Sequence, residues 1–249
     1  MTDVQSEVVT IVGSGPNAPD CAAWDKSRLG RIVAINNAWR VRSDWDDLIF
    51  PEDFAPDRMP VSVSPRQRLI EADQFVPAQN AFGGFVFGGA TMAFTAAYWA
   101  LFSLKPRVLA FIGCDMIYAQ TGPTHFYGTG TPDPLRADVS LQDLTASAMR
   151  LTLLSAQQGC ACVNLSNDPS VLCFARGTAS ALSDTPTPTI SASEHIATAL
   201  DAEAALNYVV PDGRIWEHTD RFDPAKIRGV QQLWRAAYAR QYPSKVAAQ

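Results

Sequence analysis

The chain has 249 residues, of which 47% are hydrophobic and 18% charged, and its formal net charge is −5. This is the composition of an ordinary globular protein, long enough for one generous domain with an appendage. A net negative chain without a Lys/Arg run gives no reason to expect a nucleic-acid partner.

Short apolar runs alternate with helical segments through the first two thirds of the chain. The strand candidates are Glu7–Val12, Arg31–Ile35, Asp47–Phe50, Pro60–Val63, Gln74–Val76, Arg107–Ile112 and Cys160–Asn164. The helix candidates are Ala18–Ser27, Pro65–Ala72, Gly89–Leu104 and Ser140–Gln158. This alternation predicts an α/β fold: a Rossmann-like, doubly wound, mostly parallel sheet with helices on both faces.

The first strand candidate ends in the glycine turn Gly13-Ser14-Gly15-Pro16. Such a turn lets a ligand phosphate or ribose approach the backbone, and the N-terminus of the helix that follows favours an anion. The turn lacks the third glycine of the dinucleotide fingerprint and the Gly-Lys-Ser/Thr of a P-loop. A tight strand-to-helix connection without a ligand is the alternative interpretation.

Polar residues also follow the next two strands. Asn36 and Asn37 would offer amide donors and acceptors to a base or ribose, although Asn at a strand end often only makes a turn. Asp53 follows the third strand, and its carboxylate either faces the same crevice or is a solvated turn acid.

The stretch from Gln74 to Leu104 contains no Asp, Glu, Lys or Arg. Its helical part is shorter than the roughly 20 residues that span a bilayer, so we expect a buried central helix and no membrane span. Gly88 and Gly89 open this helix and would leave its N-terminus clear for a phosphate or carboxylate, unless they serve only close packing.

A long loop, from Met116 to Val139, follows the strand that ends at Asp115. Loops of this length are usually functional or disordered, and ligands of open α/β sheets bind at the carboxyl ends of strands. The unperturbed pKa of His125, near 6.5, suits proton transfer, although a single loop His is often structural. The other polar candidates in this loop are Tyr118, Tyr127, Thr129 and Arg136.

The helix candidate after the loop carries its own boundary signals. Ser140 and Asp143 resemble a capping box, and Gly159 stands where a helix stop belongs.

The last part of the chain changes character. We expect a nucleotide-binding domain over residues 1–176, a linker over 177–193 and a helical segment over 194–249, with helices at Glu194–Leu206 and Pro224–Gln241. Ser193 and Asp223 are the expected N-caps. The second helix has an apolar stripe, which should pack on the main domain or make a homo-oligomer: Leu233, Trp234, Ala237 and Tyr238.

The five cysteines are odd in number and lie in strand or helix contexts, which is typical of reduced, buried residues. The N-terminal residues have neither the basic nor the apolar region of a signal peptide, so we expect a cytoplasmic protein. Cys160 and Cys162 share a strand face without a nearby partner pair or His, and we expect no metal site there.

Taken in order, four short motifs resemble those of the Rossmann-type bacterial sialyltransferases and of the motility-associated-factor-like and pterin-pyrophosphokinase-like proteins that share their core. Gly-Ser-Gly-Pro, Ile-Asn-Asn, Gly-Gly and Ile-Gly-Cys-Asp-Met-Ile-Tyr stand where the sialyltransferases have Gly-Asn-Gly-Pro-Ser, Arg-Cys-Asn, Thr-Ser-Gly and Ser-Gly-Ile-Asp-Phe-Tyr. The likeness covers roughly Val8 to Phe174 and includes Val163-Asn164-Leu165-Ser166.

The resemblance implies a CMP-activated sugar bound across the strand ends. By position, Ser14 replaces a nucleotide-binding Asn of that family and Asn36 retains one, while Gly88-Gly89 takes a Ser-Gly place. Asp115 keeps the family's Asp. Tyr118 falls one residue after a tyrosine that contacts the leaving phosphate.

The chain departs from that family at its catalytic segment. His-x-x-Gly-His-Ser becomes His125-Phe126-Tyr127-Gly128-Thr129-Gly130, so Thr129 stands at the place of the catalytic base. A Thr hydroxyl does not titrate near neutrality, and losing a positioned base costs roughly 10²- to 10⁴-fold in rate. The family's mobile lid is also nearly absent.

Three hypotheses follow. The first is a glycosyltransferase-like enzyme that uses a nucleotide sugar as co-substrate, with a glycan or small molecule as acceptor and no tightly bound cofactor. In it, His125 moves the proton while Asp115, Asn36 and the glycine turn hold the nucleotide, and Tyr118, Tyr127 and Arg136 meet the departing phosphate. The second is an Mg²⁺-dependent pyrophosphokinase-like enzyme with metal on carboxylates such as Asp53 and Asp115. The third is a nucleotide-binding module without catalysis.

Overall fold

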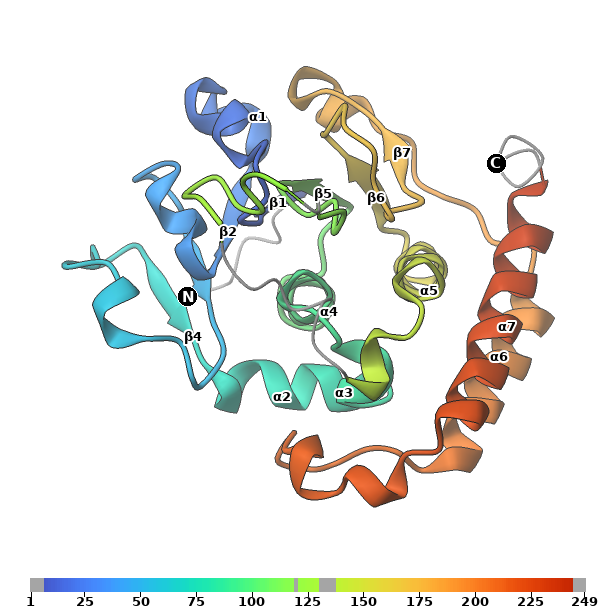
Figure 1. Ribbon diagram of the computed structural model, residues 1–249. Helices are drawn as coiled ribbons and strands as arrows, with labels where there is room; N and C mark the ends of the chain where they lie inside the picture. The colour runs from blue at the N-terminus through green and yellow to red at the C-terminus, as the bar shows by residue number, and fades with distance from the viewer. Residues whose placement is uncertain (1–6, 119–120, 130–137, 244–249) are drawn as a thin grey trace.

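The computed structural model describes residues 7–118, 121–129 and 138–243. Within them a seven-stranded, all-parallel sheet runs through the molecule in the order β4-β3-β2-β1-β5-β6-β7, which confirms the predicted α/β class (Figure 1). Its strands are β1 Val8–Val12, β2 Arg31–Ile35, β3 Asp47–Ile49, β4 Arg68–Ile70, β5 Val108–Ile112, β6 Ala161–Asn164 and β7 Ala175–Arg176.

The helices lie between and after these strands. The α-helices are α1 Lys26–Leu29, α2 Ala72–Ala81, α3 Phe85–Gly88, α4 Met92–Ser103, α5 Leu144–Gln157, α6 Ser193–Leu206 and α7 Pro224–Gln241. Short 3-10 helices occupy Ala18–Ala23, Asn36–Arg40, Pro56–Arg58, Val139–Leu141, Ala179–Asp184, Ile215–Glu217 and Thr219–Arg221.

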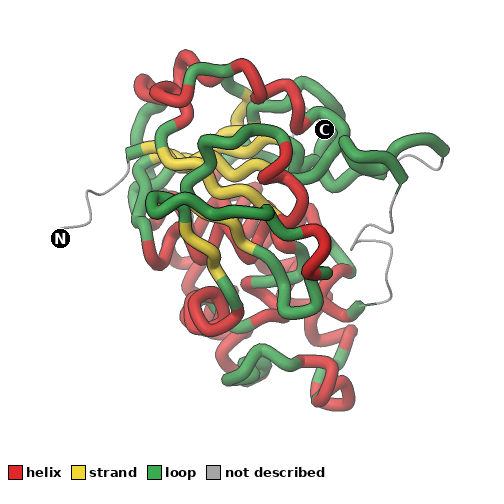
Figure 2. The backbone as a smooth tube through the Cα atoms, turned by 90° about the vertical axis from the view of Figure 1, so that its left-hand side faces the viewer, coloured by secondary structure: helices red, strands yellow, loops and turns green. Residues whose placement is uncertain are grey.

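The two faces of the sheet bury two separate cores, since alternate residues of a strand point to opposite faces. Figure 2 shows helices and loops around the strands of the sheet. Val9 and Ile11 of β1 belong to the larger core, which also contains residues of α2, α4, α5 and α7. Val12 and Ile32 belong to the smaller core under α1 and the 3-10 segments. Because both faces are covered, the strands are nearly continuous apolar runs.

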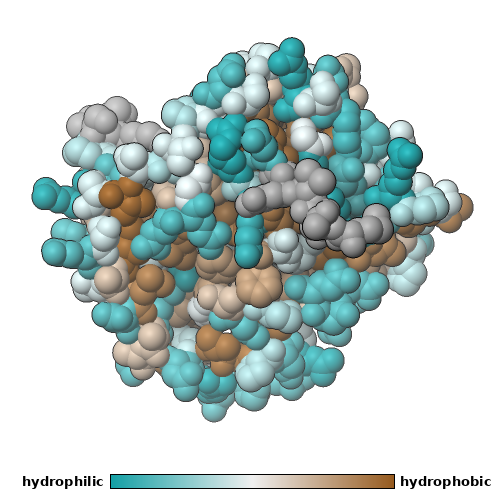
Figure 3. All heavy atoms as spheres, turned by 180° about the vertical axis from the view of Figure 1, so that it is seen from behind, coloured by the Kyte–Doolittle hydropathy of each residue, from teal (hydrophilic) through white to brown (hydrophobic). Residues whose placement is uncertain are grey.

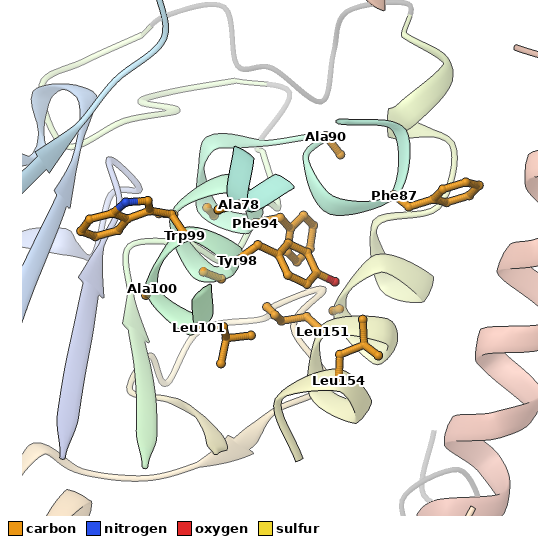
Figure 4. Packing of buried hydrophobic residues seen from close by; sticks show 14 of the residues in the cluster. Ala78, Phe87, Ala90, Phe94, Tyr98, Trp99, Ala100, Leu101, Leu151 and Leu154 are labelled. Carbon is orange, nitrogen blue, oxygen red and sulfur yellow. The ribbon is translucent and has the colours of Figure 1, made fainter. Parts of the chain in front are cut away.

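Helix α4 is the centre of the larger core, as the sequence predicts for an apolar helix without charges. Residues 93–101 are buried, and Figure 4 shows Phe94, Tyr98 and Leu101 among side chains of α2 and α5. Among the described residues, no helix has both the length and the apolar character needed to cross a membrane.

Three predictions between β3 and α4 are wrong. Residues 60–63 form no strand, because their side chains have nothing to bury: Val61 is fully exposed. The predicted helix Pro65–Ala72 contains β4, whose Leu69 and Ile70 pair with β3. The predicted strand Gln74–Val76 lies in α2, where tertiary packing against α4 outweighs the β propensity of a short apolar run.

The boundaries of α5 differ slightly from the prediction. Asp143, not Ser140, is the N-cap, and its carboxylate accepts a hydrogen bond from the backbone N–H of Ala146. Ser140 instead donates its hydroxyl to Asp138. Gly159 follows the helix with a positive φ, as expected of a C-terminal stop.

The C-terminal helices α6 and α7 lie side by side, and α7 packs against α5 (Figure 1). Asp223 caps α7 as predicted, whereas Ser193 lies inside α6 and Ala192 precedes it without a side-chain cap. Trp234 and Tyr238 of the predicted apolar stripe are buried within the chain. These residues of the stripe therefore pack against the rest of the chain, as one of the two predicted arrangements requires.

A buried ion pair ties α5 to α6 and α7. Arg150 donates to both carboxylate oxygens of Glu203 at 2.7 Å, and the indole N–H of Trp234 donates to Glu203 at 2.6 Å. Arg150 also reaches the hydroxyl of Tyr98. Burial raises the pKa of Tyr98 to about 12, so this hydroxyl stays protonated.

Hydrophilic residues make up most of the molecular face opposite to that of Figure 1, with hydrophobic residues between them in several places (Figure 3). None of the five cysteines, all of them in the described residues, forms a disulfide, and four of them are buried.

Candidate functional site

A cleft opens at the point where the strand order reverses, between β1 and β5. Strands β2 to β4 continue from one side of β1, and β5 to β7 from the other. Val12 lies opposite both Ala34 and Ile112, so the three central strands end level with one another. The cleft beyond them has a volume of about 620 Å³. This is the place where open α/β sheets bind ligands.

The glycine turn forms the floor of this strand-end cleft together with the turn after β5. Gly13 donates its N–H to Ile112, and Gly15 donates to Gly113, both at 2.8 Å. A Cβ on Gly13 would lie 2.3 Å from the Gly113 carbonyl oxygen. Glycines are therefore required where the turn after β1 and the turn after β5 approach each other. Because glycines have no side chain, the cleft is lined here by their backbone atoms.

Asn36 and Asn37 come directly after β2 and line the cleft. Asn36 has a positive φ of 52°, a conformation that Asn tolerates better than most residues. The side-chain oxygens of both residues are buried and accept no hydrogen bond within the described structure. An unpaired buried acceptor is costly, and each one in a native structure needs an explanation.

Asp115 is held at the far side of the cleft by two amides. Asn17 donates to one carboxylate oxygen at 2.8 Å, and Asn164 donates to the other at 3.2 Å. The same Asn17 nitrogen lies 2.9 Å from Asp168 and 2.7 Å from Ser166. This network joins β1, β5 and the loop after β6, and it presents two carboxylates to one amide.

His125 lies on the rim, in a tight turn that reaches back over the glycine turn. His125 and Gly128 exchange backbone hydrogen bonds, and Phe126 donates its N–H to the Ser14 carbonyl at 3.1 Å. The hydroxyl of Thr124 is 2.9 Å from Nδ1 of His125. The ring stacks on Tyr127 at a centroid distance of 4.9 Å. His125 therefore lines the same cleft as Gly13 and Gly15, so it can act on a ligand that the glycine turn holds.

The N-terminus of α4 also faces the cleft, although not through the glycines predicted to open it. Thr91 is the N-cap, and Thr91, Met92 and Ala93 line the cleft. Gly88 and Gly89 end α3 and do not line it. A Cβ on Gly89 would meet the Phe85 carbonyl oxygen at 2.7 Å, so close packing accounts for this glycine pair.

The remaining predicted residues are divided between the cleft, its surroundings and the undescribed part of the chain. Asp53, Tyr118 and Tyr127 line the cleft, as do Pro16 and the rest of the glycine turn. Thr129 is exposed, does not line it, and its hydroxyl donates to the Gly122 carbonyl at 3.3 Å. Arg136 lies outside the described residues.

Several lining residues have no place in the sequence-based site, among them Asn17, Arg58, Thr91 and Asp168. Asn17 directly follows the glycine turn, and an Asn at that place is a signal that could have been used. Asp168 follows the Asn164–Ser166 motif, which we noted only for its resemblance. Arg58 belongs to the segment between β3 and β4, where the strand assignment failed, so no sequence signal placed it at a strand end.

Burial in the floor of the cleft raises the pKa of the Cys114 thiol well above its ordinary value. The thiol therefore stays neutral near pH 7, which argues against a thiolate nucleophile. Among the described residues, no three His, Cys, Asp or Glu side chains cluster in a way that could hold a metal ion.

Comparison with known proteins gives this chain no relative: no family model, no curated protein and no solved structure matches it. The fold and the geometry of the cleft therefore stand without a family assignment.

Proposed function

We propose that this protein is a glycosyltransferase-like enzyme that binds a nucleotide-activated sugar, of the CMP-sugar type, in the strand-end cleft. The observation that carries the proposal is the pair of buried, unpartnered oxygens of Asn36 and Asn37 at the edge of a cleft beside the reversal point of the sheet.

The two amide oxygens favour a base that donates N–H groups. The exocyclic amino group of cytosine is such a donor, whereas uracil has a carbonyl at the same position. A hydrogen bond from the base would relieve an unpaired acceptor, which costs about 1–3 kcal/mol when buried. We therefore expect CMP to bind more tightly than UMP.

The phosphate would lie against the N-terminus of α4, where Met92 and Ala93 line the cleft, and beside the guanidinium of Arg58. Backbone N–H groups and the helix dipole favour an anion there. Tyr118 and Tyr127 are hydroxyl donors on the same cleft and suit the charge that builds on a departing phosphate.

His125 would move the proton. In the transfer, the acceptor oxygen attacks the anomeric carbon, the bond from that carbon to the phosphate oxygen breaks, and the acceptor proton passes to the imidazole. In this role Nδ1–H donates to the Thr124 hydroxyl, 2.9 Å away, and Nε2 is the atom that accepts the proton. His125 would then supply the base that the sialyltransferases have at the position of Thr129. The Thr129 hydroxyl donates to a backbone carbonyl instead.

A second candidate, Mg²⁺-dependent pyrophosphoryl transfer, is favoured by one specific observation. Asp115 and Asp168 approach the same amide nitrogen of Asn17 at 2.8 and 2.9 Å. Carboxylates are the ligands that Mg²⁺ takes together with substrate phosphates. These two, rather than Asp53, would then hold a metal with the nucleotide.

The test is calorimetric titration of the full chain with CMP, UMP, GDP and a CMP-sugar, each with Mg²⁺ and with EDTA. We expect CMP to bind in EDTA and Asn37→Ala to weaken it by up to about tenfold, the value of one hydrogen bond. Asn167→Ala is the control, because Asn167 is exposed and does not line the cleft. Binding that requires Mg²⁺ would favour the second candidate, and no binding of any nucleotide would overturn both.

Catalysis is tested by His125→Ala in an assay of CMP release from a CMP-sugar. The rate should fall roughly 10²- to 10⁴-fold while CMP affinity is kept. His195→Ala, on the exposed side of α6, should leave the rate unchanged. Equal rates for the two variants would contradict a catalytic His125 and leave a binding module.

A further inference from the structure

A second pocket, with a volume of about 840 Å³, adjoins the strand-end cleft. The two share a wall made of five residues from the segment after β2, the loop after β3 and the start of α4: Asn36, Pro51, Asp53, Thr91 and Met92. The opposite wall comes from the far end of the chain, between α6 and α7, and includes Asp212, Ile215 and Phe222. A ligand in this pocket would therefore lie beside whatever the cleft holds.

The inside of the pocket carries a buried acceptor without a donor. Gln79 of α2 is 1% exposed, and its amide nitrogen donates to the Thr95 hydroxyl at 2.8 Å. With the nitrogen in this bond, the side-chain oxygen is buried and accepts no hydrogen bond within the described structure. Gln79 and Asn36, the latter with a similarly unpaired oxygen, both line the pocket.

The charges around the pocket have one sign. Among the described residues that line the pocket there is no Lys, Arg or His. Four of the lining residues are acidic: Glu52, Asp53, Asp138 and Asp212. Arg214 partly neutralises one of them, since it lies 3.7 Å from Glu52. An anionic ligand would meet an excess of acidic side chains here, whereas a cation would be attracted.

The remaining walls are aromatic. Phe75, Phe85, Trp216 and Phe222 come from both ends of the chain. Trp216 is 61% exposed although it is the largest apolar side chain type. Aromatic faces attract ammonium groups and bury apolar rings or chains.

We propose that this pocket binds a small organic cation, an apolar ring or chain with a protonated amino group. An N–H donor of the ammonium would pair with the oxygen of Gln79, and its apolar body would contact the aromatic walls. That this molecule is the second substrate rests on the proposed transferase function, since the pocket shares a wall with the nucleotide cleft. The charge selectivity of the pocket is independent of that function.

Three probes of one shape and different charge test the proposal: benzylamine, benzyl alcohol and benzoate, each titrated into the full chain by calorimetry at constant ionic strength. Benzylamine should bind at least tenfold more tightly than benzyl alcohol, and benzoate should not bind. Benzoate binding as strong as that of benzylamine, or no binding of benzylamine at millimolar concentration, would overturn the proposal.

Variants place the binding. Gln79→Leu removes the buried oxygen at nearly constant volume, and Asp212→Asn removes one charge without burying anything. Each should weaken benzylamine binding several-fold or more. Asp220→Asn is the matched control, because Asp220 is exposed in the neighbouring 3-10 helix and does not line the pocket. Unchanged benzylamine affinity in Asp212→Asn would place the probe elsewhere and refute the site.

Titration of the same proteins with CMP separates this inference from the proposed function. If the parent protein binds benzylamine but not CMP, the nucleotide site alone is refuted. If it binds CMP but not benzylamine, the cation pocket alone is refuted.

Discussion

At the scale of single residues, the closest contact in the cleft is the most restrictive. Gly13→Ala would place a Cβ 2.3 Å from the Gly113 carbonyl oxygen and 2.6 Å from Cys114 Sγ. Backbone atoms must shift to relieve this, so we expect a loss of about 1–3 kcal/mol in the free energy of unfolding. Urea denaturation measures it.

Gly229→Ala serves as the control, because a Cβ there meets nothing within 4 Å and Gly229 lies within α7. Replacing a helical Gly with Ala should stabilise the protein by about 0.5–1 kcal/mol. A Gly13→Ala variant as stable as the parent would contradict the tight contact between the two turns.

A buried thiol makes the stability depend on alkaline pH. Burial raises the pKa of Cys21 from 9.0 to about 11. Since the folded-state pKa lies above the unfolded value, the stability that comes from the neutral thiol is fully present below pH 9. It is lost as the pH rises from 9 through about 11.

The measurement is the urea midpoint as a function of pH. The slope of the unfolding free energy above pH 9 should be less steep in Cys21→Ala, by at most about 1.4 kcal/mol per pH unit. Parallel curves for the two proteins would show that Cys21 does not titrate differently on folding.

Residue patterns predicted part of the site for a clear reason. Polar residues after strands converge in any parallel sheet, so Asn36, Asp115 and the glycine turn could be placed together from the sequence. Thr129 could not be separated from His125 in this way, because they lie four residues apart in one loop. Only the turn that pairs His125 with Gly128 decides which of them lines the cleft.

At the scale of elements, the ion pair between α5 and α6 should dominate the stability of the C-terminal helices. Glu203→Gln keeps the shape but leaves the buried charge of Arg150 without its counterion, and the two side chains are only 4% and 2% exposed. Breaking such a pair costs about 3–5 kcal/mol. Urea denaturation at pH 7 measures this loss.

The matched control is Glu217→Gln. Glu217 lies 4.0 Å from Arg214, and both side chains are about half exposed. Surface pairs of this kind contribute about 0–1 kcal/mol. A loss of similar size in both variants would mean that the buried pair is not a structural link.

The elements that could be predicted are those whose pattern is set locally. The start of α7 at Asp223-Pro224 and the central strands β1, β2 and β5 follow from caps and apolar runs. In contrast, β4 has an exposed first residue, and its strand identity depends on pairing with β3. Helix α2 contains Pro77, which is unusual inside a helix, and its buried residues pack in the same core as those of α4. Its helical state therefore depends on a tertiary contact that the local sequence does not show.

At the scale of the whole molecule, the alternation of strands and helices predicted the class of the fold but not the shape of its surface. The segment between α6 and α7 was expected only to belong to a C-terminal appendage, and it closes a pocket beside the cleft. Gln79 and Phe222 line the same pocket although they lie far apart in the sequence, so no local pattern could predict that they belong to one site.

This arrangement has a consequence for biosynthesis. A ribosome delivers the amino end first, so β1 to β5 and the glycine floor can come together while the later helices are still being translated. The aromatic chamber next to them gains its last wall only when Phe222 has emerged. A nascent chain arrested shortly before that point would possess the strand-end cleft and lack the complete second pocket.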